Sequence, residues 1–214
     1  MTTSTLDDTL ARARSALDMP TLYWLGQGGW VAGQRPLPTP GRPFDPAAAL
    51  AALKADNPAK HAAYTAGLRR LGMTAAQLPR SACDCSGFVA WCLGLPRHPM
   101  ALDGQADQWL YTDSIVADAL GRRQAFTALA QARVGALLVF PSAGRARPVG
   151  HVAWITAVDG GRATRILHCA PQNFEAEPPP GRPRNAIAET DTAVFDGEAA
   201  ADTRVVAFNA FLDA

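Results

Sequence analysis

The chain has 214 residues, of which 48% are hydrophobic and 18% charged, and its formal net charge is +1. This length suffices for one domain with a sizeable core. Nothing in this nearly neutral balance suggests nucleic acid or an anionic membrane surface as the main partner. Every apolar run is far shorter than the roughly 20 residues that span a bilayer, so no membrane partner is expected.

The N-terminus and the cysteines indicate where the chain is made. Residues 6–10 read Leu-Asp-Asp-Thr-Leu, with acids where a secretory leader would carry a basic segment and an apolar core. We therefore expect no signal peptide and synthesis in the cytoplasm. Of the four cysteines, Cys83 and Cys85 are too close to bridge comfortably, and no disulfide framework emerges, which fits a reducing compartment.

The first 80 residues predict helices and loops. The apolar stripe of 6–17 predicts a helix that ends before Pro20. Residues 23–30, aromatic and glycine-rich, are either a loop anchored in the core or a wall of a cleft. After a proline-rich extended loop, residues 45–78 predict a helical unit in which Asp45-Pro46 and Asn57-Pro58 each open a helix.

A small polar cluster at 81–86 leads directly into an amphipathic run. Counting from Cys85, the apolar residues Phe88, Val89, Cys92 and Leu93 fall at i+3, i+4, i+7 and i+8, which predicts one face of a helix. Cys85 then lies in the first turn, where unpaired N–H groups and the helix dipole favour a thiolate. A small buried hydrophobe is the alternative, and position alone leaves both open.

The second half predicts a sheet. We expect residues 104–133 to be mostly helical, with breaks near Thr112-Asp113 and at Gly121. Strands are then expected at 135–140, 149–158, 162–170 and 203–209, with a loop over 175–185. Helices first and strands second predict an α+β fold in which N-terminal helices pack on a C-terminal antiparallel sheet.

Two of the four histidines fall on neighbouring predicted strands. If Asp159-Gly160 is the two-residue turn, His151 lies directly opposite His168, with Cβ atoms roughly 5 Å apart. A turn at Gly160-Gly161 makes the pair diagonal but keeps it on one face, whereas a three-residue loop would separate the rings.

A thiol at a helix start beside two facing histidines suggests nucleophilic catalysis. Cys85 would attack an acyl carbon, His151 would accept the thiol proton, and His168 would orient His151. The backbone N–H of Cys85 would donate to the oxyanion. Zinc held by these three residues and Cys83 is the rival use, although Cys-x-Cys is tighter than the usual spacing of structural sites.

These segments resemble, in order, the NlpC/p-sixty family of papain-like cell-wall cysteine peptidases. The similar segments are the aromatic-glycine motif at 23–30, the nucleophile motif 84–89, the motif 95–97, the strand 135–140, the histidine motif 150–152 and the strand 166–170. The strand 135–140 departs from the family in carrying Ala136 where an acid is usual. The resemblance implies one catalytic domain over 1–214, with a helical insertion at about 31–80.

The resemblance also implies an activity. It implies hydrolysis of amide bonds in peptidoglycan stem peptides, such as D-glutamyl-diamino acid bonds, by Cys85, His151 and His168 without a cofactor. Substrate binding is expected of Tyr23, Trp24, Asp84 and Ser86. From their position in the loop just before His151, Arg145 and Arg147 could meet substrate carboxylates, although a solvated loop is the favoured interpretation. Acyl transfer or hydrolysis on another amide, or muropeptide binding without catalysis, are the alternatives.

A chain without a leader would be similar in this respect to the amidase effectors that type VI secretion injects. In that case we expect export by a specialised route to the cell wall, and an inhibitor or immunity protein as a partner.

Overall fold

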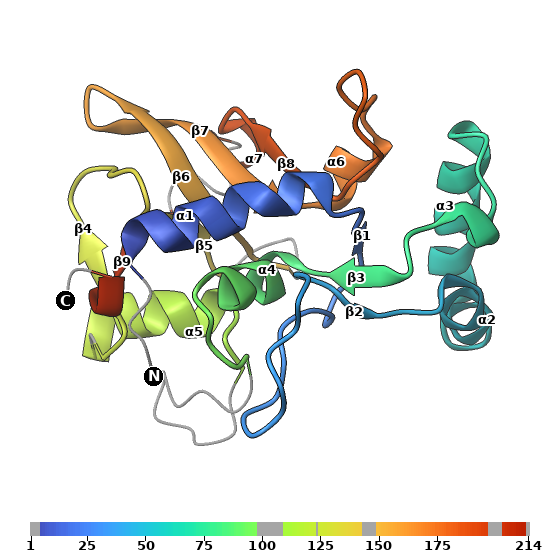
Figure 1. The fold of residues 1–214 in the computed structure, drawn as a ribbon, viewed down its shortest axis with the longest axis horizontal. Helices are drawn as coiled ribbons and strands as arrows, with labels where there is room; N and C mark the ends of the chain where they lie inside the picture. The colour runs from blue at the N-terminus through green and yellow to red at the C-terminus, as the bar shows by residue number, and fades with distance from the viewer. Residues whose placement is uncertain (1–4, 98–108, 123, 143–148, 197–202, 213–214) are drawn as a thin grey trace.

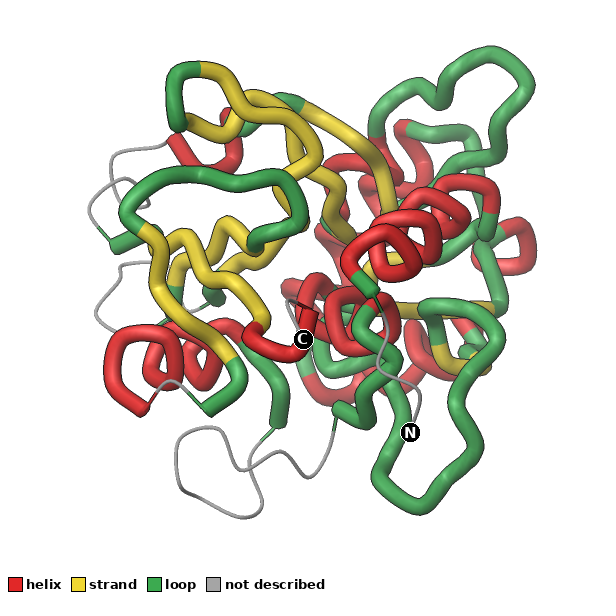
Figure 2. The backbone as a smooth tube through the Cα atoms, turned by 60° about the vertical axis from the view of Figure 1, so that its left-hand side comes forward, coloured by secondary structure: helices red, strands yellow, loops and turns green. Residues whose placement is uncertain are grey.

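The computed structural model describes residues 5–97, 109–122, 124–142, 149–196 and 203–212. The second half of the chain builds a six-stranded antiparallel sheet with the order β4-β9-β5-β6-β7-β8. The strands are β4 Phe126–Leu129, β5 Leu137–Phe140, β6 His151–Asp159, β7 Arg162–Cys169, β8 Ile187–Thr190 and β9 Val205–Asn209. Figure 2 shows these strands gathered in one half of the molecule and most of the longer helices in the other. The predicted α+β, papain-like arrangement is confirmed.

Helix α4, Cys85–Cys92, lies between the two halves. All eight of its residues are buried, and it packs against α1 (Leu6–Ser15) on one side and β6 and β7 on the other (Figure 1). A helix that is apolar almost all round is stable only when it is covered in this way. The predicted helix beginning at Cys85 is therefore confirmed.

The helical unit before α4 lies to one side. Helices α2 (Pro46–Asp56) and α3 (Pro58–Arg70) extend from β2 (Arg42–Pro43) and β3 (Ser81–Cys83), which form a small sheet with β1 (Leu22–Tyr23). Figure 1 shows both helices at the end of the molecule away from the six-stranded sheet. Asp45 and Asn57 cap them, as the sequence predicts. None of the helices in the described ranges is long and apolar enough to cross a bilayer.

The region after residue 108 differs from the prediction. Helix α5, Thr112–Ala117, is short and continues as a π-helical turn over Asp118–Arg122, and β4 then begins at Phe126. The expectation of helix to residue 133 is therefore wrong. The buried Asp118 carboxylate accepts hydrogen bonds from the N–H groups of Gln124, Ala125 and Phe126 and so ends the helix.

Three short elements between β7 and β9 were not predicted. They are β8, α6 (Pro171–Glu175) and α7 (Ala193–Asp196). The strand β8 has only four residues, of which the first alone is buried, and this is too short for periodicity to reveal it. Thr190, the last residue of this strand, contacts His168.

Candidate active site

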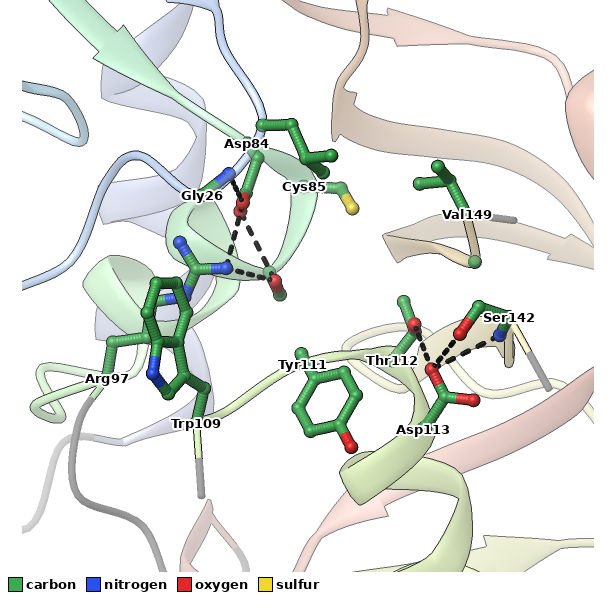
Figure 3. A pocket seen from close by; sticks show the side chains of 13 residues that line it. Gly26, Asp84, Cys85, Arg97, Trp109, Tyr111, Thr112, Asp113, Ser142 and Val149 are labelled. Carbon is green, nitrogen blue, oxygen red and sulfur yellow. Dashed lines mark hydrogen bonds and ion pairs between the residues drawn. The ribbon is translucent and has the colours of Figure 1, made fainter. Parts of the chain in front are cut away.

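Cys85 is the first residue of α4, and its side chain faces a pocket. Asp84 is the N-cap, and its Oδ1 accepts a hydrogen bond of 2.8 Å from the N–H of Gly87. Cys85 is only 4% exposed, and Figure 3 shows its sulfur directed toward the segment that carries Val149. Helix α4 packs against β6, so the thiol lies beside the strand that begins at His151.

The two histidines lie diagonally across β6 and β7, as predicted for a turn at Gly160-Gly161. The turn is Gly160-Gly161, because Asp159 pairs with Arg162, so the directly opposite arrangement is wrong and the diagonal one is correct. His151 Nε2 lies 2.7 Å from His168 Nδ1, and the rings meet edge to face at 81°. Both side chains are buried, and the ring of Phe195 packs on His151 with a centroid distance of 5.4 Å.

Burial sets the protonation of this site. Burial first and the charge of Asp84 second raise the pKa of Cys85 to about 12, against the smaller opposite effects of Arg97 and of backbone hydrogen bonds from Val152 and Ser86. Burial also lowers the pKa of His151 well below its usual value and that of His168 to about 4. The expectation that the helix start favours a thiolate is therefore wrong for the resting site, because desolvation of the sulfur outweighs the helix dipole. Thiol and imidazole rest uncharged, and the proton must move during attack.

Asp84 and Ser86 belong to a buried ion-pair cluster. Arg97 Nη2 lies 2.8 Å from Asp84 Oδ2 and 2.9 Å from Ser86 Oγ, and Nη1 donates to the carbonyl of Gln27. Asp84 Oδ2 also accepts a 2.8 Å hydrogen bond from the N–H of Gly26 (Figure 3). The cluster ties the glycine-rich loop to the start of α4. In the sequence Arg97 is recognisable only as part of the motif 95–97. No sequence pattern predicts its ion pair with Asp84.

The pocket beside Cys85 has a volume of about 370 Å³. Exposed apolar side chains border it, namely Leu25, Trp109 and Val149. The polar lining residues include Tyr111, Thr112, Asp113 and Ser142 as well as Asp84, Ser86 and Arg97 (Figure 3). The pocket combines the sulfur of Cys85 with an apolar rim. Of its charged lining residues, Asp84 and Arg97 form an ion pair with each other.

The remaining residues predicted to bind substrate lie elsewhere. Tyr23 and Trp24 are not among the described residues that line this pocket. The ring of Trp24 packs against Phe44 and Tyr64 and so joins the glycine-rich segment to the helical unit. Tyr23 is half-buried, and burial together with the charge of the nearby Cys85 raises its pKa. Arg145 and Arg147 lie outside the described residues.

Cys83, the fourth residue of the zinc alternative, faces the protein interior. Its Sγ donates to the carbonyl of Asp84 at 3.2 Å, and it packs against Gly28. Among the residues that the structure describes, no three His, Cys, Asp or Glu side chains are grouped to hold a metal ion.

The neutral histidines predict a dependence of stability on pH. We expect the free energy of unfolding to fall as the pH is lowered from about 6.5 to 5. In this range the histidines bind protons in the unfolded chain, whereas in the folded protein their lowered pKa values keep them neutral. The decrease is at most about 1.4 kcal/mol per pH unit for each histidine. Urea unfolding at half-unit intervals measures it, since most carboxylates titrate below this window.

Two variants test whether the buried histidines cause this dependence of the free energy of unfolding on pH. His168→Asn, which cannot take up a proton, should make it shallower, and His61→Ala on α3 should leave it unchanged. An equal slope in all three proteins would contradict the assignment.

A family model provides an independent comparison. The model described as the CHAP domain matches residues 77–169, a range that includes Cys85, His151 and His168. The search of curated proteins found no match. CHAP domains are typically amidases or peptidases that act on peptidoglycan. Residues 77–169 therefore match the CHAP domain, which belongs with the NlpC/p-sixty family to the papain-like cysteine peptidases and amidases.

Proposed function

We propose that the protein is a cysteine amidase that hydrolyses amide bonds in peptidoglycan stem peptides. The observation that carries the proposal is the position of Cys85, which begins α4, lines the pocket and accepts a backbone hydrogen bond from Val152, the residue that follows His151 of the buried His151–His168 pair. The CHAP match supports peptidoglycan as the substrate class.

The reaction follows from the neutral resting state. Cys85 Sγ forms a bond to the amide carbon while its proton passes to His151. The negative charge develops on the amide oxygen, where the backbone N–H of Cys85 donates a hydrogen bond. Collapse breaks the C–N bond, and the amine takes the proton from His151. A water, deprotonated by His151, then hydrolyses the thioester and restores the thiol.

His168 orients the base in this scheme. Its Nδ1 lies 2.7 Å from His151 Nε2, so His151 keeps the hydrogen bond throughout the cycle. The imidazolium that forms after proton transfer donates to His168, which stabilises it less than a carboxylate would. A thiol needs less help than a hydroxyl, because it is intrinsically more acidic.

Purified protein incubated with peptidoglycan fragments tests the proposal. We expect mass spectrometry to show new amine and carboxyl ends with the wild-type protein and none with Cys85→Ala. Cys92→Ala, at the other end of α4, is the matched control and should remain active. Activity in Cys85→Ala would exclude a thiol mechanism. Inactivity of all proteins on these fragments would favour another amide substrate or a muropeptide-binding role.

A further inference from the structure

Three polar side chains form a diagonal line across β6, β7 and β8. His151 begins β6, and His168 lies near the end of β7. His168 pairs with Ala188 of β8, so Thr190, two residues farther along, lies on the same face. Thr190 Oγ1 is 3.1 Å from His168 Nε2, the ring nitrogen that does not face His151.

The hydrogen bonds have one consistent direction. Thr190 Oγ1 also lies 2.8 Å from the backbone carbonyl of Asp191, which can only accept, so the hydroxyl donates its proton there. Toward His168 the hydroxyl must then accept, which places a proton on His168 Nε2. A neutral imidazole carries one proton, so His168 Nδ1 is bare and accepts from His151 Nε2–H. This leaves the Nδ1 of His151 unprotonated.

The direction has a chemical consequence for the base. An imidazole can take a proton from a thiol only through a nitrogen that has none. If His168 instead carried its proton on Nδ1, it would donate to His151 Nε2 and force the His151 proton onto Nδ1. The histidine pair would then keep its 2.7 Å contact, but His151 would have no bare nitrogen left for the thiol proton. A hydroxyl outside the pair therefore decides between an active and an inactive arrangement.

We propose that Thr190 is a positioning residue that fixes the tautomers of both His168 and His151, so that His151 keeps a bare Nδ1 for the thiol proton. This proposal rests on the proposed function in assigning Cys85 and His151 as nucleophile and base. Thr190 itself touches neither of the reacting atoms and acts through His168. It lies on a strand that the sequence did not predict.

Nitrogen NMR of ¹⁵N-histidine-labelled protein, on Thr190→Val and Thr190→Ser, tests the proposal. Valine keeps the shape and the preference for a strand but cannot accept a hydrogen bond. We expect the Nε2–H tautomer for both histidines in the wild type and in Thr190→Ser, and a mixture of tautomers in Thr190→Val. We also expect Thr190→Val to lower kcat by about 10- to 100-fold, as for other residues that orient a functional histidine through a hydrogen bond.

The rate of alkylation of Cys85 by iodoacetamide gives a readout that needs no peptidoglycan. It should fall in Thr190→Val and recover in Thr190→Ser. Thr192→Val is the matched control, because the Thr192 hydroxyl binds the Asp196 carboxylate and should leave both readouts unchanged. Circular dichroism and thermal unfolding verify that each variant is folded, and Thr190→Ala replaces the valine variant if that one does not fold.

The outcomes separate the two proposals. Wild-type tautomers and alkylation rate in folded Thr190→Val or Thr190→Ala would overturn the role of Thr190, whatever the substrate. Altered tautomers and slower alkylation, restored by serine, support it even if peptidoglycan fragments are not cleaved, in which case the substrate assignment alone fails.

Discussion

Replacing His151 with alanine is expected to lower kcat for amide hydrolysis by about 10⁴-fold at pH 7. The reason is the uncharged resting site. With the pKa of Cys85 raised to about 12, roughly one thiol in 10⁵ would ionise unaided at neutral pH. Here the base must supply the thiolate in each turnover.

The same argument predicts a characteristic pH dependence for His151→Ala. Hydroxide can replace the missing base, so the residual rate should rise about tenfold per pH unit between pH 7 and pH 10. The wild-type rate should not rise in this way, since His151, with its lowered pKa, is already neutral over that range. Rates measured on the peptidoglycan fragment that the wild type cleaves would show the difference.

A histidine elsewhere in the chain provides the control. His61 lies on α3, away from the six-stranded sheet, so His61→Ala should retain wild-type kcat and pH profile. If His151→Ala kept more than a tenth of the wild-type activity, His151 would not be the general base.

The local parts of the site were predictable because each rests on short-range rules. The apolar spacing after Cys85 placed it at a helix start. The spacing between His151 and His168 left two registers with the rings on one face, and the second is the one observed. Caps such as Asp45-Pro46 and Asn57-Pro58 located the two helices of the helical unit before α4.

The features that were not predictable depend on tertiary contacts. The burial that raises the pKa of Cys85 comes from the packing of α4 against the sheet, whereas a sequence pattern shows only the helix dipole acting in the other direction. Arg97 meets Asp84 across thirteen positions, and Thr190 meets His168 across twenty-two. Residues 126–129 became a strand rather than a helix because β9, far along the chain, pairs with them.

The ion pair between Arg97 and Asp84 should be among the largest single contributions to stability near the site. Its side chains are 6% and 2% exposed, so replacing Arg97 with methionine would leave a buried carboxylate without its cation. Loss of one partner of a buried pair typically costs about 3–5 kcal/mol. In a chain of this length, each kcal/mol lowers Tm by about 2–4 °C, so we expect a decrease of about 10 °C.

The pair of Arg80 and Asp45 is the matched control because its geometry is similar but its side chains are 63% and 61% exposed. Water screens such a pair, so Arg80→Met should change the free energy of unfolding by less than about 1 kcal/mol. Urea unfolding of the two variants measures both values. Equal small losses would mean that the N–H groups of Gly26 and Gly87 alone satisfy the Asp84 carboxylate.

Arg97→Met should also act on the chemistry where the protein remains folded. The guanidinium lowers the pKa of Cys85 while Asp84 raises it, so removing only the cation leaves the sulfur facing an uncompensated negative charge. Alkylation of Cys85 by iodoacetamide, measured well below the new Tm, should therefore be slower in Arg97→Met and unchanged in Arg80→Met. An unchanged alkylation rate in a destabilised Arg97→Met would limit the buried pair to holding the glycine-rich loop against α4.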